Sequence, residues 1–357
     1  MTSDQPAEVP GAQPAVVLVD GAAGGELAAV AEALTGPLAT PTVLLRGADL
    51  AAAPIVLGPS GRLAVGDRVV RPVVVWLRHV SAGALLAQSS PAGSASPLAA
   101  QSWADLLGQL AGSAGIALPG TVPAGTGQLR AAERLGVRTP RTVLTTDLAA
   151  GVRALGAARV IVKSPDFRLY QPDRAQWPAC LPVIHDAAEL DGATAQLDGT
   201  TAVLDGPVAR SELLDRPVVV QEYLPHAREL RVYYLDGSCC AFEVRHRGPA
   251  SIWTDPASVR VTAVDCPARV VEAVRLLATG WQLRYGAFDL LVRDDEEPVF
   301  LEVNLDGDWL WYEHKADWHG VSFMAAVMVR ELFLRATGDG RAAVPPAGAE
   351  GSAPPVD

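Results

Sequence analysis

Two acidic residues, Asp289 and Glu302, lie inside two apolar segments that have the pattern of neighbouring β-strands. Both segments are rich in β-branched and aromatic residues, and an acidic run separates them: residues 285–293, 294–297 and 298–304. This pattern predicts a hairpin. If its turn is centred between Asp295 and Glu296, then Asp289 is six residues before the first of these and Glu302 is six residues after the second. The two carboxylates are then expected to face each other across the strands.

Carboxylates in that position need a positively charged partner. Directly opposed residues have Cβ atoms about 4.5–5.5 Å apart, and like charges at this separation repel. Asn304 lies two residues beyond Glu302 and therefore on the same face of its strand. Two carboxylates and an amide oxygen suit Mg²⁺ that is held partly by substrate phosphates. The alternative is a solvated hairpin with its charges on the outer face, but the apolar residues that flank each acid favour buried strands.

Composition narrows the class of protein. A chain of 357 residues can hold two or three packed units, and 49% hydrophobic with 19% charged residues is typical of a soluble globular protein. No apolar run reaches about 18 residues and the N-terminus lacks a basic start, so we expect a cytoplasmic protein with no membrane partner. The net charge of −11 argues against a nucleic-acid partner. Four cysteines without C-x-x-C spacing are expected to be reduced and structural.

Alternating strand and helix patterns in the first part of the chain predict an α/β fold. An apolar run at 15–20 leads through a glycine-rich loop at 21–25 into a helical pattern at 26–34. The loop fits neither G-x-G-x-x-G nor the P-loop pattern, so a plain turn is favoured over a phosphate cradle. Further strands are expected at 42–45, 73–77, 142–145 and 160–163, with helices at 103–110, 128–135 and 148–155.

The last third of the chain has a different pattern, dominated by strands. The turn Asp236-Gly237 between apolar runs is a strong hairpin signal. Strands are expected at 217–224, 230–234 and 239–245, and helices at 267–279 and 322–336. Residues 164–208 have weak periodicity, and the Ala, Gly and Pro content beyond Gly338 predicts a disordered tail.

Four short stretches resemble the ATP-grasp ligases, and within them the maturases of graspetides, which are microviridin-like peptides. The stretches are Gln221-Glu-Tyr-Leu224, Glu229-Leu-Arg231, Phe288-Asp289 and residues 300–313. The last is the most specific, because Gly307 and Trp309-Leu310-Trp311 match the residues that follow the acid-x-Asn element of that group. The resemblance covers roughly residues 100–337.

This resemblance implies a fold and a division into domains. The ATP-grasp fold would follow an N-terminal pre-ATP-grasp α/β domain at 1–118. A central subdomain at 119–212, with a possible role in leader-peptide recognition, would precede a C-terminal antiparallel-sheet subdomain at 213–337 that carries the metal site. Residues 338–357 would form the tail.

It also implies a nucleotide site. Lys163 matches the lysine that contacts ATP phosphates, in a chain with only two lysines; its alternative role is an exposed residue at a strand end. The hinge that reads adenine, mainly through backbone groups, would consist of Gln221, Glu222, Tyr223 and Leu224. Glu229 matches the acid near the ribose, and a surface pair of Glu229 with Arg231 is the alternative.

Three arginines, Arg231, Arg245 and Arg247, are implied as catalytic residues, since a guanidinium suits bidentate contacts with phosphate. Solvent-facing charge is the alternative for Arg245 and Arg247. Asp289, Glu302 and Asn304 would be the Mg²⁺ ligands. Two departures from the family stand out: a lysine is missing before Gln128, where Arg130 is the candidate replacement, and the loop after Lys163 is not glycine-rich.

The implied activity is the ATP-dependent joining of Asp or Glu side chains of a ribosomal precursor peptide, leader plus core, to its own Ser, Thr or Lys side chains. The products would be ester or amide macrocycles, with ATP and Mg²⁺ as cofactors and a homodimer as the candidate assembly. Two rivals stay open at this stage. One is a ligase that acts on free amino acids or on a protein C-terminus, and the other is a catalytically silent binding protein that kept the fold.

Overall fold

The computed structural model describes residues 12–21, 25–47, 54–80, 97–165, 181–192 and 217–338. The chain forms two units: one contains residues 1–23, 27–118 and 325–357, and the other contains residues 24–26 and 119–324. The expected tail after Gly338 lies outside the described residues, as does most of the stretch 164–208 in the central subdomain for which leader recognition was expected.

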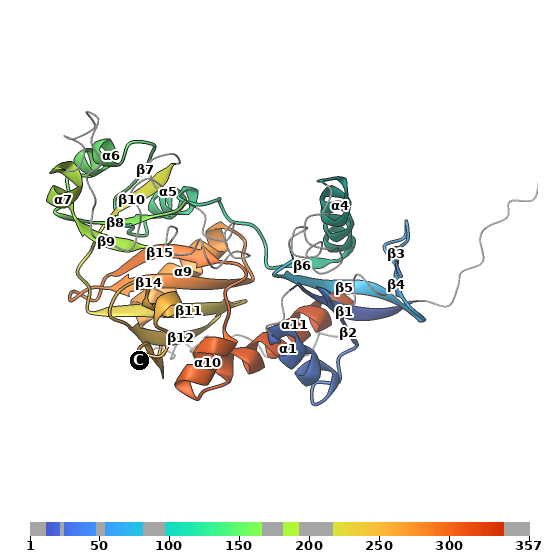
Figure 1. The fold of residues 1–357 in the computed structure, drawn as a ribbon. Helices are drawn as coiled ribbons and strands as arrows, with labels where there is room; N and C mark the ends of the chain where they lie inside the picture. The colour runs from blue at the N-terminus through green and yellow to red at the C-terminus, as the bar shows by residue number, and fades with distance from the viewer. Residues whose placement is uncertain are drawn as a thin grey trace, which may run out of the picture. The chain divides into compact units, whose positions relative to one another are not determined.

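The first unit is built on a mixed sheet with strand order β2-β1-β5-β4-β3, and β6 pairs with β5 (Figure 1). The strands are β1 (Gln13–Asp20), β2 (Thr42–Arg46), β3 (Ile55–Leu57), β4 (Leu63–Val65), β5 (Arg68–Arg78) and β6 (Ile116–Leu118). β1 pairs in parallel with both β2 and β5. A parallel strand is covered on both faces, which explains why six consecutive residues of β1 are buried and apolar except for Asp20.

The helices of this unit are α1 (Glu26–Thr35), α4 (Pro97–Ser113) and the part of α11 (Gly320–Thr337) from Ala325 onward. Leu107 and Leu110 of α4 pack in one core cluster with Val17 and Val19 of β1. The sequence predicted β1, β2, β5, α1 and α4 with shorter bounds. It did not predict β3, β4 and β6, because three-residue strands are too short to show a period.

The second unit holds two antiparallel sheets. The smaller one has the order β7-β10-β8-β9 and consists of β7 (Thr142–Thr145), β8 (Arg159–Lys163), β9 (Val183–Asp186) and β10 (Val218–Glu222). α6 (Leu148–Leu155) and α7 (Ala187–Gly192) lie against this sheet in Figure 1. Val152 and Leu155 of α6 share a core cluster with Val160, Val162 and Val220. One face of the sheet is therefore covered by helices.

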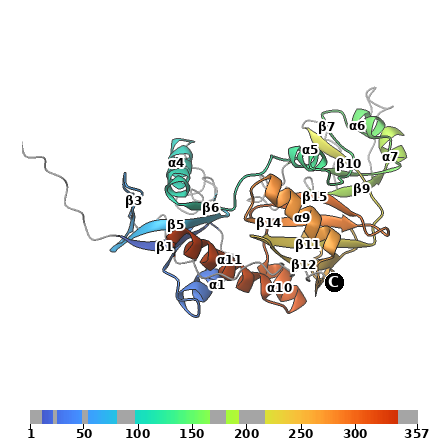
Figure 2. The ribbon, with the colours of Figure 1, turned by 180° about the vertical axis from the view of Figure 1, so that it is seen from behind.

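The larger sheet has the order β13-β12-β11-β14-β15. Its strands are β11 (Arg228–Leu235), β12 (Ser238–Arg245), β13 (Arg260–Val264), β14 (Tyr285–Val292) and β15 (Pro298–Asn304). α9 (Ala268–Gly280) crosses one face, as Figure 2 shows, and buries Val270, Val274 and Leu277 against it. Asp236 and Gly237 both have positive φ, as a two-residue hairpin turn requires. The expected hairpin is confirmed.

Three further helices complete the second unit: α5 (Gly127–Arg134), α8 (Ser251–Thr254) and α10 (Leu310–Ala316). None of the helices in the described ranges is long and apolar enough to cross a membrane. Cys239, Cys240 and Cys266 are free thiols, and burial raises the pKa of each to about 11, 11 and 12 respectively.

Candidate active site

The two acids that the sequence predicted to face each other are direct neighbours: Asp289 of β14 pairs with Glu302 of β15. The route to this pairing differs from the expected one. Leu290 pairs with Phe300, so the turn is centred on Asp295, half a residue earlier than the expected centre between Asp295 and Glu296. Glu296 has φ of 63°, as the last residue of a three-residue hairpin loop often does. A regular ladder from that turn would place Asp289 opposite Leu301.

A β-bulge at Leu301 restores the pairing. The cause lies in the core: Phe300 and Val303 both belong to the cluster under α9, although residues three apart in a regular strand point to opposite faces. The bulge lets both side chains enter the core. It also turns Glu302 to the opposite face, where Asp289 lies.

Arg231 of β11 provides the positive charge beside Asp289. It pairs with Asp289 in the ladder, and its Nη1 donates to both carboxylate oxygens at 2.8 and 2.7 Å. Arg231 is 7% exposed, and its guanidinium also lies over the rings of Tyr233 and Tyr312. Burial and the facing charge of Glu302 raise the pKa of Asp289 to about 6 despite Arg231. Two carboxylates, those of Asp289 and Glu302, thus share this part of the sheet with the single guanidinium of Arg231.

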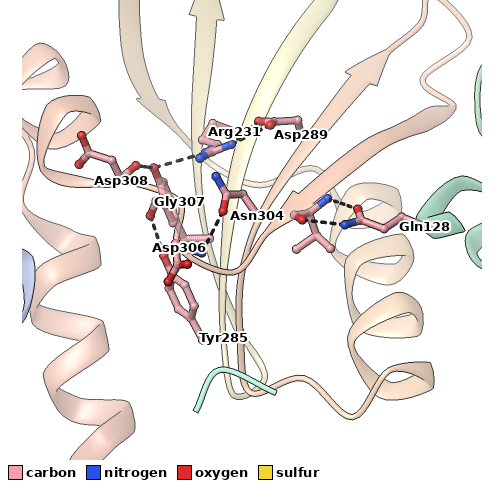
Figure 3. A network of polar contacts seen from close by, with 10 residues as sticks. Gln128, Arg231, Tyr285, Asp289, Asn304, Asp306, Gly307 and Asp308 are labelled. Carbon is pink, nitrogen blue, oxygen red and sulfur yellow. Dashed lines mark hydrogen bonds and ion pairs between the residues drawn. The ribbon is translucent and has the colours of Figure 1, made fainter. Parts of the chain in front are cut away.

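The loop after β15 packs over this face of the sheet. Figure 3 shows Arg231 between Asp289 and the backbone of Gly307 and Asp308. The hydroxyl of Tyr285 donates to the Gly307 carbonyl at 2.9 Å, and the hydroxyl of Tyr233 donates to the Asp308 carbonyl. Gly307 is buried, and a Cβ there would lie 2.4 Å from the Ala287 Cβ and 2.5 Å from Arg231 Nη2. Close approach, and not a positive φ, requires the glycine.

β15 is an edge strand, and Gln128 of α5 covers its outer side. The Gln128 side chain donates to the Val303 carbonyl at 3.2 Å and accepts from the Val303 N–H at 2.9 Å (Figure 3). A second contact on this edge joins two backbone groups: the Phe300 N–H donates to the Arg138 carbonyl at 2.9 Å. These contacts satisfy edge groups that would otherwise be open to another strand. They also fix the backbone between Glu302 and Asn304.

Replacing Gln128 with Ala is expected to lower the free energy of unfolding by about 2 kcal/mol, because two buried backbone groups of Val303 lose their partners. Denaturant titration of both proteins measures the difference. Gln101→Ala is the matched control: its side chain makes one exposed hydrogen bond to Asp105, and a change below about 0.5 kcal/mol is expected. Equal stability of the Gln128 and Gln101 variants would contradict the positioning of β15 by Gln128.

The oxygen atoms at this site fit a hard divalent cation. Among the described residues, no three or more His, Cys, Asp or Glu side chains are grouped to hold a metal ion. The set consists instead of two carboxylates, Asp289 and Glu302, and the amide of Asn304 on the same face. Asn304 Oδ1 also accepts from the Asp306 N–H at 2.9 Å, which orients the amide. Three protein oxygens suit Mg²⁺, which keeps waters and takes further ligands from substrate phosphates.

The predicted phosphate-binding lysine lies in the smaller sheet. Lys163 pairs with Val219, and Ile161 pairs with Gln221, so Lys163 and Gln221 share the face opposite the helix-covered core. Gln221 is 2% exposed and donates to the Thr142 hydroxyl at 3.0 Å. Lys163 is half-buried, and no residue of the described part forms a hydrogen bond or ion pair with its ammonium.

The hinge after β10 differs from the expectation in one side chain. Both carboxylate oxygens of Glu222 accept from Arg141, from its backbone N–H at 2.7 Å and its Nε at 2.8 Å. Glu222 thus stabilises the hinge instead of pointing a free carboxylate at a ligand. Arg159 stacks on the Tyr223 ring at 4.3 Å, and the Tyr223 N–H donates to the Arg159 carbonyl. Within the described part, the Leu224 N–H makes no hydrogen bond.

Glu229 pairs with a residue that sequence reasoning missed. The expected alternative was an ion pair with Arg231, but Arg231 bonds to Asp289, and Glu229 Oε2 lies 2.9 Å from His246 Nε2. This hydrogen bond is the main cause that raises the pKa of His246 above its ordinary value. The six histidines of the sequence show no metal-binding spacing, so spacing alone does not single out His246.

Within the described residues, the other two predicted arginines, Arg245 and Arg247, form no ion pair with Asp289 or Glu302. In the ladder, Phe242 and Val244 share the face of Arg231, so Arg245 points to the opposite face. There its Nε donates to Glu243 at 2.6 Å, and its side chain is 78% exposed. Arg247 follows the strand and is exposed, with no ion pair to any residue in the described ranges.

Comparisons with known proteins identify the fold. No protein-family model and no curated protein sequence matches this chain. The solved structure of the ATP-grasp ligase PsnB, complexed with a phosphomimetic variant of minimal precursor, Mg and ADP, is 19% identical. It covers 91% of this chain and 99% of its own, with a TM-score of 0.66.

Two other solved structures are also similar. The macrocyclase MdnC from Microcystis aeruginosa MRC, bound with precursor peptide MdnA, is 20% identical over 88% of this chain and 99% of its own, with a TM-score of 0.63. The D-cycloserine synthetase DcsG is 15% identical over 90% and 99%, with a TM-score of 0.51. This chain therefore has the ATP-grasp fold, as the sequence predicted.

Proposed function

We propose that this chain is an ATP-dependent ligase that activates Asp or Glu side chains of a ribosomal precursor peptide as acyl phosphates and closes ester or amide macrocycles. The carrying observation is the direct pairing of Asp289 with Glu302, beside Asn304 and Arg231, in a fold shared with PsnB and MdnC. Structures of those two proteins contain a phosphomimetic variant of a minimal precursor and a precursor peptide, respectively.

In this proposal each part of the second unit has a task in nucleotide binding. The Leu224 N–H reads adenine, Glu229 accepts from the ribose, and the Lys163 ammonium neutralises phosphate charge. Asp289, Glu302 and Asn304 hold Mg²⁺, which when bound offsets the charge on the transferred phosphate. The exposed guanidinium of Arg247 is a further candidate for contact with phosphate.

The reaction has two steps. A substrate carboxylate oxygen attacks the γ-phosphorus of ATP, so that an acyl phosphate forms and ADP leaves. A hydroxyl or amine of the peptide then attacks the acyl carbon and loses its proton as the C–O or C–N bond forms and phosphate leaves. Arg231 lies beside the acids and stabilises the oxyanion that develops at the acyl carbon. Each bond formed removes one water from the peptide.

The test is to incubate the full chain with ATP, Mg²⁺ and a short peptide encoded beside its gene that contains Asp or Glu with Ser, Thr or Lys. Mass spectrometry should show the loss of one water per bond, and ADP should be released only when the peptide is present. ADP release with free amino acids, and none with the peptide, would support a small-molecule ligase instead. A protein that binds ATP and releases no ADP with either substrate would be a binding protein.

A further inference from the structure

His246 and Glu229 form an isolated polar pair at the end of the strands that carry the site. His246 lies two residues beyond Val244, the ladder partner of Glu229, so both side chains continue the face of Arg231 and Asp289. The His246 side chain is 10% exposed and that of Glu229 is 22% exposed. The pair is therefore largely removed from water on the face of the proposed nucleotide site.

The hydrogen bonds of this pair are incomplete. His246 Nε2 contacts Glu229 Oε2, but His246 Nδ1 is buried with no partner in the described part of the chain. The second oxygen of Glu229 likewise accepts no hydrogen bond from the described residues. A buried nitrogen without a partner costs stability, so a purely structural pair would be poorly built. Among the described residues, Glu229 is the one side chain that forms a hydrogen bond with the imidazole.

The charge of Glu229 in this pair also acts on residues of the proposed metal site. The charge of Glu229 raises the pKa of both Asp289 and Tyr312, so its carboxylate lies close enough to act on them. An unpaired Glu229 would add a third negative charge near Asp289 and Glu302, where ATP phosphates must bind. The hydrogen bond to Glu229 raises the pKa of His246 and so favours the protonated imidazole, whose charge opposes that of Glu229.

We propose that His246 is a positioning residue of the nucleotide site: it holds one oxygen of Glu229, so that the other oxygen is fixed to accept from a ribose hydroxyl. The proposal rests on the function proposed above and adds a specificity determinant to it. A carboxylate fixed by one hydrogen bond loses less freedom when it binds a hydroxyl, in the way that outer partners orient metal ligands.

Calorimetric titration of the full chain with Mg²⁺ and either ADP or 2′,3′-dideoxyadenosine 5′-diphosphate tests this role. The wild type should prefer ADP by about 10-fold or more, as a hydrogen bond between a hydroxyl and a carboxylate predicts. His246→Ala should lower the affinity for both nucleotides, because the charge of Glu229 is left unpaired, and should lower the affinity for ADP by about 10-fold more than the affinity for the dideoxy nucleotide. His246→Gln, which keeps a side-chain N–H donor, should recover part of the loss. His319→Ala, an exposed histidine, is the matched control with no expected effect.

The outcomes separate the two proposals. If the wild type binds neither nucleotide, the proposed function fails. Equal affinity of the wild type for both nucleotides would overturn only the ribose role of Glu229 and His246. An equal loss for both nucleotides in His246→Ala would show a structural role for His246 and would also overturn the inference.

Discussion

Glu302→Gln is expected to reduce ATP-dependent dehydration of the precursor peptide by at least about 100-fold, with little change in the free energy of unfolding. Glu302 is exposed and makes no hydrogen bond or ion pair within the described residues, so the fold does not depend on its charge. The proposed Mg²⁺ site does depend on it, because Glu302 supplies one of only two carboxylates. Product mass and ADP release measure the rate, and chemical denaturation measures stability.

Asp289→Asn is expected to lose both activity and stability. Asp289 is the charge partner of Arg231, which is 7% exposed, and removing one member of a buried ion pair leaves the other charge uncompensated. We expect a loss of about 2 kcal/mol, below the ~3–5 kcal/mol typical of fully buried pairs, because the Asp289 side chain is 24% exposed. Glu302→Gln is thus the cleaner test.

The control for both variants is Glu297→Gln. Glu297 lies in the turn of the same hairpin and forms an exposed ion pair with Arg269. Such pairs contribute at most about 1 kcal/mol, and we expect unchanged activity. If Glu302→Gln were as active as Glu297→Gln, the Mg²⁺ site and the proposed ligase mechanism would both be wrong.

The β14–β15 hairpin shows which structural details sequence patterns can predict and which they cannot. Apolar alternation and the acidic turn were sufficient to pair Asp289 with Glu302. They did not reveal that the turn is centred on Asp295 or that a bulge at Leu301 compensates, because a bulge is decided by which side chains the core accepts. Phe300 and Val303 both enter that core, and only the packed structure shows this.

The β11–β12 hairpin contained a signal that was not used. Its two-residue turn, Asp236-Gly237, fixes the register, and the same counting places Glu229 opposite Val244. Alternation then puts His246 on the face of Glu229 and Arg245 on the other face. Counting from this turn could therefore have identified His246 as a residue on the face of the site. The same counting could have shown that Arg245 lies on the opposite face. The engagement of Glu222 by Arg141 could not be found, because these residues are far apart in the chain.

Gly307→Ala is expected to damage the site through packing alone, since the substitution changes no charge. The added methyl would lie 2.4 Å from the Ala287 Cβ and 2.5 Å from Arg231 Nη2, closer than heavy atoms can approach. The loop cannot lift freely, because Tyr285 and Tyr233 hold the carbonyls of Gly307 and Asp308, respectively. Arg231 must then move away from Asp289, or those hydrogen bonds must break. Overpacking of this kind costs about 1–3 kcal/mol.

A double-variant cycle separates the two clashes of Gly307→Ala. Ala287→Gly removes the nearer methyl group, so adding it to Gly307→Ala should restore part of the stability. Activity should remain low in the double variant, because the contact with Arg231 persists. Gly248→Ala is the control: a Cβ there meets nothing within 4 Å, and we expect stability within about 0.5 kcal/mol of the wild type. If Gly307→Ala matched Gly248→Ala in stability and activity, the loop after β15 would not be what holds Arg231 against Asp289.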